Sequence, residues 1–370
     1  MKIGIDARFL RSEGVGRYIE ELVQHLPKVD PGNRYHMYCT AEAEKRRLMS
    51  EAPNLKASIL PAMPFSPWEQ PLLTLRLRKD RLALFHATNC WTAPLFSPCP
   101  VVVTVHDVFH RRLPEAVSFK ARVYGHLFFP LALARAERII AVSRFTAEEL
   151  LRYYPKTAGR ITVIYHGMNP VFTPLRDSEH LRTFREKYEI PPRYFLYVGS
   201  PRRYKNLTGL LEAFSLLPRH LQSTLAMVIR ASGPQLPDLV RRARAFGLQE
   251  KVRFIEWLPS EDLVPLYSGA LAFVTVSLYE SFCYPVVEAM ACGTPVIAPN
   301  HLALPEITQG AALLVDPHDL QAIKEAMERV ATDDSLRGDL VEKGLQRAKD
   351  FPWRGASEEV VRVYHEVLSR

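Results

Sequence analysis

The chain has 370 residues, which exceeds the size at which a single hydrophobic core usually stops growing, so the length favours two domains. Hydrophobic residues make up 47% and charged residues 24%, a composition that excludes an intrinsically disordered chain and one dominated by membrane spans. The net charge of +8 favours anionic partners such as nucleotide phosphates, a polyprenyl diphosphate or a phospholipid surface, although a solvated basic surface would give the same balance.

Short β-branched runs alternate with longer helical patterns through the first half of the chain. The predicted strand and helix pairs are 2–7 with 17–26, 100–107 with 118–136, and 138–143 with 146–154. Such alternation is typical of parallel sheets with crossover helices. The longest apolar run, 127–133, is interrupted by Pro130 and is far shorter than the roughly 20 residues that cross a bilayer.

The alternation stops near Pro174, where prolines and charges replace the apolar periodicity, and it resumes after Pro192. Helical patterns then separate further apolar runs, at 194–200, 224–232, 251–258, 270–277 and 294–299. The sequence therefore predicts two doubly wound halves joined by a linker. Residues 357–370 place Val360, Val361, Tyr364 and Val367 at helical spacing, so one face of this last helix should be packed.

The cysteines and the amino terminus bear on the compartment. Five cysteines are odd in number and show no C-x-x-C spacing, so neither a disulfide framework nor a zinc site is indicated. The start MKIGIDARFL lacks the pattern of a signal peptide. We expect a protein of the reducing cytoplasm.

Ligands of doubly wound sheets bind where the strands end, and four such places stand out. The first is RSEGVGRY, where Gly14, Val15 and Gly16 precede a helix whose N–H groups would favour a phosphate. Ile19 occupies the last glycine position of a dinucleotide fingerprint, so that motif is excluded. A tight turn is the alternative interpretation of the glycines.

The second place is the end of VVVTVHD. His106 could bind a sugar hydroxyl or act as an acid or base near neutral pH, and it could equally be structural. Asp107 could line the cleft, or it could cap a helix or turn.

The third place is YVGSPRRYKNL, a strand followed by a glycine turn and three cations. Gly199 and Ser200 form the turn, and Asn206 is a plausible N-cap of the next helix. Arg202, Arg203 and Lys205 beside a helix start could hold the charges of a diphosphate, the alternative being an exposed basic loop.

The fourth place is SLYESFCYPVVEAMACGTPVIAP. Pro285 suits a first helical turn and Gly293 the position after a helix, so a short helix should lie between two strands. Glu280 then lies in the loop before the helix and Glu288 about one turn inside it. Apolar neighbours on both sides make a surface position for Glu288 awkward.

In these motifs the chain resembles the group 1 (family 4) retaining glycosyltransferases of GT-B fold, and among them the mannosyltransferases. The resemblance runs from IGIDAR and GVGRY through VTVHD, AVSRFTAEEL, VIYHGMNPVFTP and YVGSPRRYKNL to ESFCYPVVEAMACGTPVIAP, LPEI and LLVDP. It implies an α/β fold of two Rossmann-like domains facing across a cleft. We place an N-terminal acceptor domain at 1–174, a linker at 175–189, a donor domain at 190–353 and a crossover helix at 354–370 that packs on the first domain.

The resemblance also implies roles for single residues. Lys205 would grip the donor diphosphate, Glu280 would bind hydroxyls of the donor sugar, and Glu288 would bind the ribose. Backbone N–H groups of Ser281, Phe282, Cys283 and Tyr284 would face the donor, and His106 the sugar. Gly14, Val15, Gly16 and Asp107 would line the cleft on the acceptor side.

Two departures from the family pattern concern the donor loops. The arginine that usually follows the glycine or precedes the lysine of the third motif is replaced by Ser200 and Tyr204, so Arg202 or Arg203 would substitute. Ser281 and Cys283 replace the glycines of the usual E-G-F-G form. A positive φ at Cys283 would cost about 1 kcal/mol or more.

The function implied is the metal-independent transfer of a hexose, with retention, from a nucleotide-diphosphate sugar to a glycan or polyprenyl-diphosphate-linked acceptor. GDP-mannose is the first donor to consider and the UDP-hexoses follow. No cofactor and no nucleic-acid partner is expected. The alternatives are a nucleotide-sugar-binding protein impaired in transfer and a nucleotide-sugar epimerase of the same fold.

Two further features of the sequence each allow two interpretations. Trp257 could lie near the donor base or pack in the core. The segment PFSPWEQPLLTLRLRKD, 64–80, could dock on an anionic membrane at the inner face, or its helix could be buried in the first domain.

Overall fold

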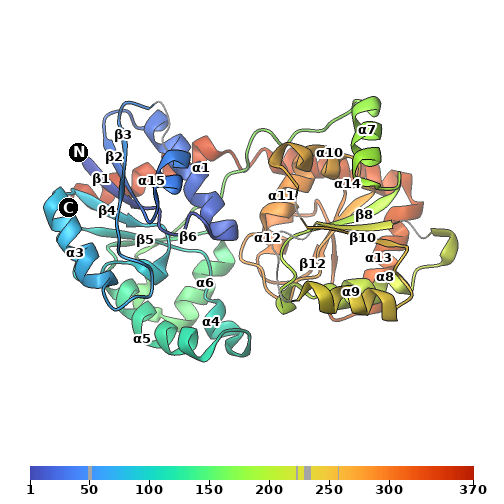
Figure 1. Cartoon of the computed structure of the whole chain (residues 1–370), viewed down its shortest axis with the longest axis horizontal. Coiled ribbons are helices and arrows are strands. Elements are labelled where there is room, and N and C mark those ends of the chain that lie inside the picture. Colours follow the sequence, from blue (N-terminus) through green and yellow to red (C-terminus); the bar gives the residue numbers. More distant parts are fainter. Residues whose placement is uncertain (49–51, 222–223, 229–234, 257) are drawn as a thin grey trace. The chain divides into compact units, whose positions relative to one another are not determined.

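The computed structural model describes residues 1–48, 52–221, 224–228, 235–256 and 258–370 (Figure 1). The chain divides into two compact units, one of residues 1–167 with 351–370 and one of residues 168–350. The first part of this unit therefore ends at residue 167, seven residues before the predicted boundary at 174. Its second part begins at residue 351, three residues before the predicted start of the crossover helix at 354.

The first unit is built on a parallel sheet. Its described residues form seven strands in the order β3-β2-β1-β4-β5-β6-β7, and every pair is parallel. In register, Ile3 lies opposite Tyr35 of β2 and Leu84 of β4, so the strand order reverses beside β1. The strands are β1 (Lys2–Asp6), β2 (Arg34–Cys39), β3 (Leu55–Ile59), β4 (Leu84–Ala87), β5 (Val101–Val105), β6 (Arg138–Ala141) and β7 (Ile161–Val163).

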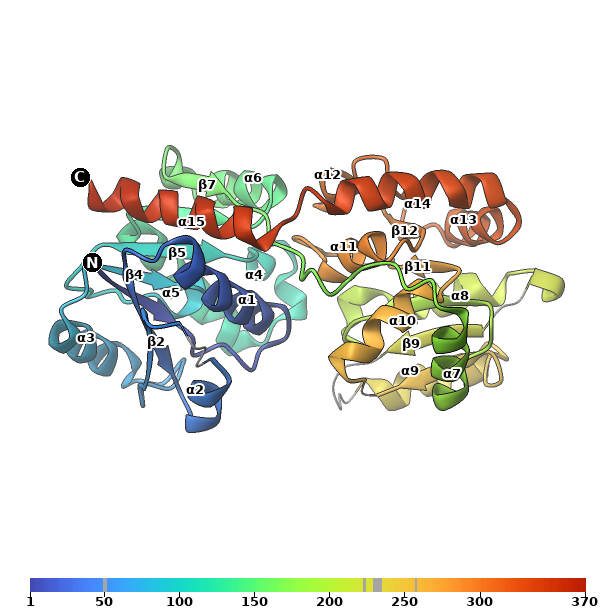
Figure 2. The ribbon, with the colours of Figure 1, turned by 90° about the horizontal axis from the view of Figure 1, so that it is seen from above.

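Helices cover both faces of this sheet. They are α1 (Glu13–Val29), α2 (Glu42–Leu48), α3 (Glu69–Asp80), α4 (Phe109–Arg112), α5 (Phe119–Arg135), α6 (Arg144–Tyr153) and α15 (Trp353–Leu368). Helices α3, α5 and α6 share one apolar core with β4 and β5. Helix α15 lies alongside α1, as Figure 2 shows.

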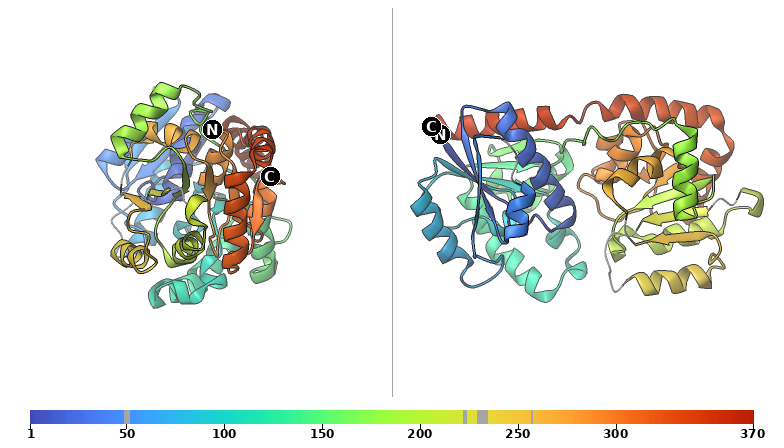
Figure 3. Two further views of the ribbon diagram at one scale, coloured as in Figure 1. Left: turned by 90° about the vertical axis from the view of Figure 1, so that its right-hand side faces the viewer. Right: turned by 45° about the horizontal axis from the view of Figure 1, so that its top comes forward.

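Helix α15 is anchored in the first unit by apolar and polar contacts. Val360, Val363, Tyr364 and Val367 are buried, and the Tyr364 hydroxyl lies 2.6 Å from Nδ1 of His86 on β4. The buried face thus includes Val363, whereas the predicted Val361 is only partly buried. Figure 3 shows both termini at one end of this unit.

The second unit repeats the doubly wound plan. Its described residues form six parallel strands in the order β10-β9-β8-β11-β12-β13. The order reverses at β8, which pairs with β9 on one side and β11 on the other. The strands are β8 (Tyr194–Val198), β9 (Thr224–Val228), β10 (Val252–Ile255), β11 (Ala272–Val274), β12 (Val296–Pro299) and β13 (Leu313–Val315).

The helices of the second unit also pack in layers. They are α7 (Ser178–Tyr188), α8 (Leu207–Ser215), α9 (Leu236–Ala245), α10 (Leu263–Ser268), α11 (Tyr284–Ala291), α12 (Leu304–Thr308), α13 (Leu320–Thr332) and α14 (Asp334–Ala348). Helices α8, α9 and α13 share one apolar core with β8 and β11. Helix α11 packs against α14, where Gly344 lies close to Met290.

The predicted linker 175–189 contains helix α7. Asp177 begins the helix, because its Oδ1 accepts hydrogen bonds from the N–H groups of Glu179 and His180. Phe184 is 3% exposed and fixes the helix to the rest of the unit. Apolar periodicity did not predict this helix, because prolines and charged residues dominate the segment. A good N-cap and one buried aromatic side chain are enough to form it.

Two further observations concern the compartment and the membrane. All five cysteines lie in the described part of the chain and are free thiols. Across the residues that the structure places, no helix combines the length and the apolar character needed to cross a membrane.

Candidate functional site

The loops that follow β8 and β11 meet at the carboxyl end of the second sheet. Leu278 N–H donates to the carbonyl of Tyr204 at 2.7 Å, which joins the two loops through their backbones. The Lys205 ammonium donates to Oε1 of Glu280 at 2.7 Å. Their side chains are only 17% and 10% exposed, so an ion pair largely shielded from water lies where a doubly wound sheet binds its ligand.

The surroundings keep Lys205 charged. Burial opposes the charge, but the Glu280 carboxylate and the nearby Tyr204 outweigh it, so the pKa of Lys205 is raised above its usual range. The ammonium also lies 5.1 Å from the centre of the Tyr204 ring. Lys205 is therefore a fixed positive charge at neutral pH and a poor proton donor.

Backbone geometry accounts for the glycine and the asparagine of this loop. Gly199 has a φ of 154°, and a Cβ there would come within 2.6 Å of the Tyr197 hydroxyl, so a larger residue would clash. Asn206 adopts a φ of 53° at the N-cap position of α8. Its side chain does not make the predicted capping hydrogen bond, and its amide donates to the carbonyl of Pro317 at 2.8 Å.

The two arginines of the third motif are more exposed to solvent than its lysine. Arg202 and Arg203 are exposed, whereas Ser200 is buried and its carbonyl accepts from Tyr197 at 3.2 Å. The structure thus brings Lys205 together with Glu280 and leaves both guanidinium groups at the surface of the same loop.

The loop from Glu280 to Tyr284 ends in a strained residue. Cys283 has a φ of 75° and sits at the N-cap of α11, so the positive φ considered from the sequence is present. Burial and the Glu280 carboxylate raise the pKa of its thiol. Phe282 is buried and its ring meets that of Tyr284 edge-on at 5.4 Å, while Ser281 is partly exposed.

Glu288 lies inside α11, which begins at Tyr284 and ends at Ala291, close to the bounds predicted from Pro285 and Gly293. It is 2% exposed, which excludes a surface position. The Tyr267 hydroxyl of α10 donates to its Oε2 at 2.7 Å. Tyr267 was not predicted from the sequence, because α10 and α11 are separated by β11 and no local spacing links the two residues.

In the first unit, His106 follows β5 and lies in an aromatic cluster. Its ring is 5.0 Å from that of Tyr18 and 5.4 Å from that of His166. Nε2 lies 2.8 Å from the carbonyl of Thr88, and since a carbonyl can only accept, we assign the ring proton to Nε2. Burial lowers the pKa of His106 to about 4, so the ring is neutral at pH 7 and Nδ1 is an acceptor.

The other predicted cleft residues of this unit have local roles. Oδ1 of Asp107 accepts from Phe109 N–H at 3.0 Å, which is the turn cap considered as the alternative. Gly14, Val15 and Gly16 lie at the start of α1, where Gly14 has a non-helical φ of 9° and kinks the first turn. A Cβ at Gly16 would come within 2.1 Å of the Leu10 carbonyl, whereas a Cβ at Gly14 would meet open space.

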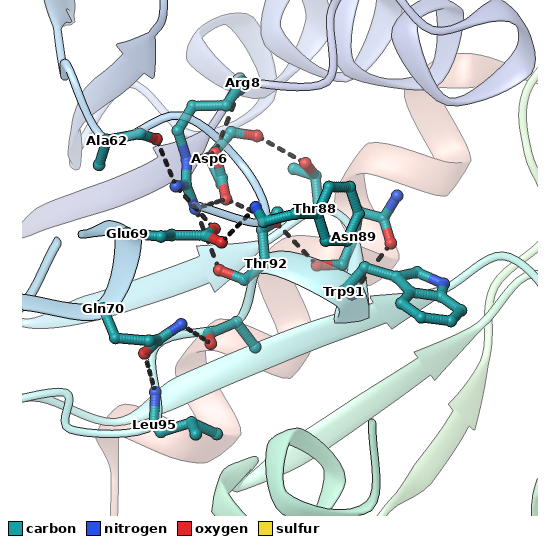
Figure 4. Close-up of polar contacts among 12 residues, drawn as sticks. Asp6, Arg8, Ala62, Glu69, Gln70, Thr88, Asn89, Trp91, Thr92 and Leu95 are labelled. Atoms are coloured by element: carbon teal, nitrogen blue, oxygen red, sulfur yellow. Dashed lines mark hydrogen bonds and ion pairs between the residues drawn. The ribbon is translucent and has the colours of Figure 1, made fainter. Parts of the chain in front are cut away.

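A buried ion network at the end of β1 was not predicted (Figure 4). Arg8 donates to both carboxylate oxygens of Asp6, at 2.8 and 2.7 Å, and to Oε1 of Glu69 at 2.9 Å. It also donates to the carbonyls of Ala62 and Thr92, at 3.0 Å each. These bonds fix the loop that leads into α3 against the sheet.

Three further sequence predictions concern Trp257, the segment 64–80 and metal binding. Trp257 lies outside the described residues. In the segment 64–80, Leu73 and Leu77 are buried, whereas Phe65, Trp68 and Leu75 are 53%, 70% and 63% exposed. Among the residues that the structure describes, no group of three or more His, Cys, Asp or Glu could hold a metal ion.

Comparisons with known proteins agree with this architecture. Residues 12–172 match the family model for glycosyltransferase family 4, and residues 182–347 match the model for glycosyl transferases group 1. Together the two models cover every described strand of both sheets except β1, Lys2–Asp6.

Two curated relatives are mannosyltransferases of Escherichia coli. The chain is 31% identical over 265 residues to O-antigen chain mannosyltransferase B, which covers 71% of this chain and 69% of that protein. It is 30% identical over 238 residues to the serotype-specific mannosyltransferase WbdA, which covers 63% of this chain and only 29% of that longer protein.

Two solved structures share the fold. Sucrose-phosphate synthase from Thermosynechococcus elongatus superposes with a TM-score of 0.81 at 22% identity, covering 100% of this chain and 99% of that one. Anabaena HepE, solved in complex with UDP and glucose, gives a TM-score of 0.80 at 19% identity, covering 99% and 100%. With the family models, the E. coli relative and the fold in agreement, the chain belongs to the group 1 glycosyltransferases of GT-B fold.

Proposed function

We propose that this glycosyltransferase moves a hexose, with retention of the anomeric configuration, from a nucleotide-diphosphate sugar to a glycan or polyprenyl-diphosphate-linked acceptor. The observation that carries the proposal is the shielded Lys205–Glu280 pair at the ends of β8 and β11. GDP-mannose is the first donor to test, because two relatives are mannosyltransferases. A UDP-hexose is the second, because HepE was solved with UDP and glucose.

In this proposal Lys205 stabilises the departing diphosphate. Its raised pKa keeps it cationic, so it offers a fixed charge where negative charge develops. Arg202 or Arg203 would add a second cation from the same loop, which makes a metal ion or other cofactor unnecessary. When the donor binds, the diphosphate replaces Glu280 as the partner of Lys205, and the freed carboxylate accepts hydrogen bonds from the sugar hydroxyls.

The bond changes require no covalent intermediate on the protein. The bond from the anomeric carbon to the diphosphate oxygen breaks, and the acceptor hydroxyl oxygen forms a bond to that carbon on the same face. The acceptor proton passes to the departing diphosphate oxygen. Glu280, released from Lys205, is engaged with sugar hydroxyls. Lys205 is already protonated and too weakly acidic to supply a proton at pH 7.

Glu288 and His106 would orient the donor. The carboxylate of Glu288 is held by the Tyr267 hydroxyl, so its position suits the two hydroxyls of a ribose. Nδ1 of His106 would accept a hydrogen bond from a sugar hydroxyl, since Nε2–H is already bonded to Thr88. His106 thereby acts as a neutral acceptor and not as an acid.

The test is a thermal-shift and product-release screen of the chain with UDP-, GDP- and ADP-sugars. We expect one nucleotide series to raise the melting temperature and to release nucleotide diphosphate faster when an acceptor is added. Proton NMR of the product should show the anomeric configuration of the donor. Conversion of the donor without an acceptor to an isomeric nucleotide sugar would overturn the proposal in favour of an epimerase. Binding without turnover would favour an impaired transferase.

A peripheral contact with an anionic membrane is the second part of the proposal. A polyprenyl-linked acceptor resides in a membrane, and the chain carries a net charge of +8. We place this contact at the cytoplasmic face, where nucleotide sugars and anionic lipids meet.

A further inference from the structure

Helix α5 has an apolar side chain at nearly every position of its outer face. Phe119, Val123, Leu127 and Leu131 follow each other at intervals of four and are 75%, 42%, 66% and 55% exposed. The opposite side of the same helix buries Phe128, Phe129, Ala132 and Leu133 in the core of the first unit. A helix at the surface of a water-soluble domain normally turns polar residues outward, so α5 departs from the expected pattern.

Exposed aromatic side chains extend this apolar surface beyond the helix. Phe65 lies 5.1 Å, ring to ring, from Tyr124 of α5, and Arg135 at the end of α5 donates to the carbonyl of Ser97 at 3.0 Å, beside Phe96. Phe65 and Phe96 are 53% and 68% exposed. We call the set Phe65, Phe96, Phe119, Val123, Leu127 and Leu131 the α5 face.

The loops that supply these aromatic residues are held in place and not loosely attached. The Glu69 carboxylate is anchored by Arg8, and its Oε2 accepts from Phe65 N–H at 2.7 Å (Figure 4). Gln70 donates to the carbonyl of Ala93 and accepts from Leu95 N–H, which ties the loop before Phe96 to α3. Phe65 itself has a φ of 65°, a conformation that is strained for a large side chain. Phe65 thus keeps a strained backbone although its ring stays about half exposed to solvent.

The charge around the α5 face is positive. Helix α5 contains Lys120, Arg122 and Arg135 and no Asp or Glu. An apolar stripe bordered by cations is the pattern with which a helix lies in the surface of an anionic bilayer.

We infer that the α5 face docks on the surface of an anionic phospholipid bilayer. Phe119, Leu127 and Leu131 enter the boundary between headgroups and acyl chains, and Lys120 with the neighbouring arginines contacts the phosphates. A second copy of the chain is disfavoured as the occupant, because a two-fold contact would bring this basic border against itself. The inference rests on the proposed function only for the reason why docking is useful, which is access to a lipid-linked acceptor.

The test is flotation of the purified chain with vesicles, without donor or acceptor. Vesicles of phosphatidylcholine with 30 mol% phosphatidylglycerol, roughly a bacterial proportion of anionic lipid, are compared with pure phosphatidylcholine. We expect binding only to the anionic vesicles and a fall in binding at high salt. The variant Leu127→Glu with Leu131→Glu should lose at least about tenfold in bound fraction, because charges enter the apolar stripe.

The matched control carries the same change of charge elsewhere. Leu216→Glu with Leu314→Glu replaces leucines that are 50% and 38% exposed in the second unit, and it should float like the parent chain. Melting temperature and the shift caused by nucleotide diphosphate verify that each variant is folded, and both should be unchanged.

The inference would be overturned if the α5 variant floated as well as the parent chain, or if the control variant lost as much binding as the α5 variant. It would also be overturned if the parent chain did not float and instead formed a dimer that the substitutions in α5 dissociate. Because no turnover is measured, failure here leaves the proposed transfer reaction untouched. A failed donor screen likewise leaves the docking surface untouched.

Discussion

The first unit buries its polar side chains among protein partners, whereas the second unit sets a charged pair at the open ends of two strands. In the first unit, Arg8 is bonded to two carboxylates and two carbonyls, and His86 is bonded to Thr104 and Tyr364. In the second, Lys205 and Glu280 face one another across two loops and retain 17% and 10% exposure. A closed network serves the fold, while an ion pair at the ends of strands that keeps some exposure can exchange one partner for a ligand.

The largest difference between the units should follow removal of Arg8. Arg8→Met leaves Asp6 and Glu69 buried without their cation, which is expected to lower the free energy of unfolding by about 3–5 kcal/mol. The measurement is urea unfolding combined with hydrogen exchange resolved by unit. Arg47→Met is the control, because Arg47 makes a similar two-bond contact with Glu20 but is 57% exposed. That control should change stability by less than about 1 kcal/mol; equal effects of the two variants would mean that burial is not decisive.

Removal of Lys205 should affect catalysis more than folding. Lys205→Ala deletes the cation that we propose stabilises the leaving diphosphate, so we expect kcat to fall by about 10²–10³-fold. Product release with the donor identified in the screen measures this. Lys187→Ala in the same unit removes an exposed lysine that pairs with Asp262 and should leave kcat unchanged. Near-normal turnover in Lys205→Ala would remove the residue from the mechanism.

Acid should weaken the first unit before the second. Burial lowers the pKa of His86 to about 3 and that of His110 to about 4, so both are neutral when folded but take up protons near pH 6.5 when unfolded. Stability is therefore fully present above about pH 6.5 and is lost as the pH falls toward 4. Between pH 7 and 5.5 we expect a loss of about 1 kcal/mol for each of these imidazoles. Hydrogen exchange should show faster opening in residues 1–167 than in 168–350, and uniform acceleration would contradict the comparison.

A smaller effect is expected where Tyr267 holds Glu288. Tyr267→Phe deletes one hydrogen bond to a buried carboxylate, so the donor Michaelis constant should rise by about fivefold, a loss of roughly 1 kcal/mol. Tyr194→Phe is the matched control, since its buried hydroxyl donates to the Leu266 carbonyl and not to a carboxylate.

The smallest effect concerns the strained Cys283. Cys283→Gly relieves a φ of 75° and should raise the free energy of unfolding by about 0.5–1 kcal/mol, without loss of transfer. Cys292→Gly is the control, because Cys292 has a φ of −81° and is buried, and there glycine should destabilise. Destabilisation by both substitutions would show that packing of the Cys283 side chain outweighs the strain.

Local sequence patterns predicted the elements of the candidate site in the second unit, but they missed contacts between residues that are far apart in the sequence. Pro285 and Gly293 bounded α11, and the apolar neighbours of Glu288 indicated its burial, because these signals act within one helix. Arg8 reaches Glu69 across 61 positions and Thr92 across 84, separations over which no periodicity operates. Asn206 was misassigned as a side-chain cap for the same reason, since its partner Pro317 is 111 positions away.

The return of α15 to the first unit has a consequence for the order of folding during synthesis. His86 is made early, but its partner Tyr364 emerges from the ribosome 278 residues later, after the whole of the second unit. The second unit can close while the first still lacks the helix that covers α1. The unit translated first is thus the last to be completed, and until then it exposes the surface that α15 will bury.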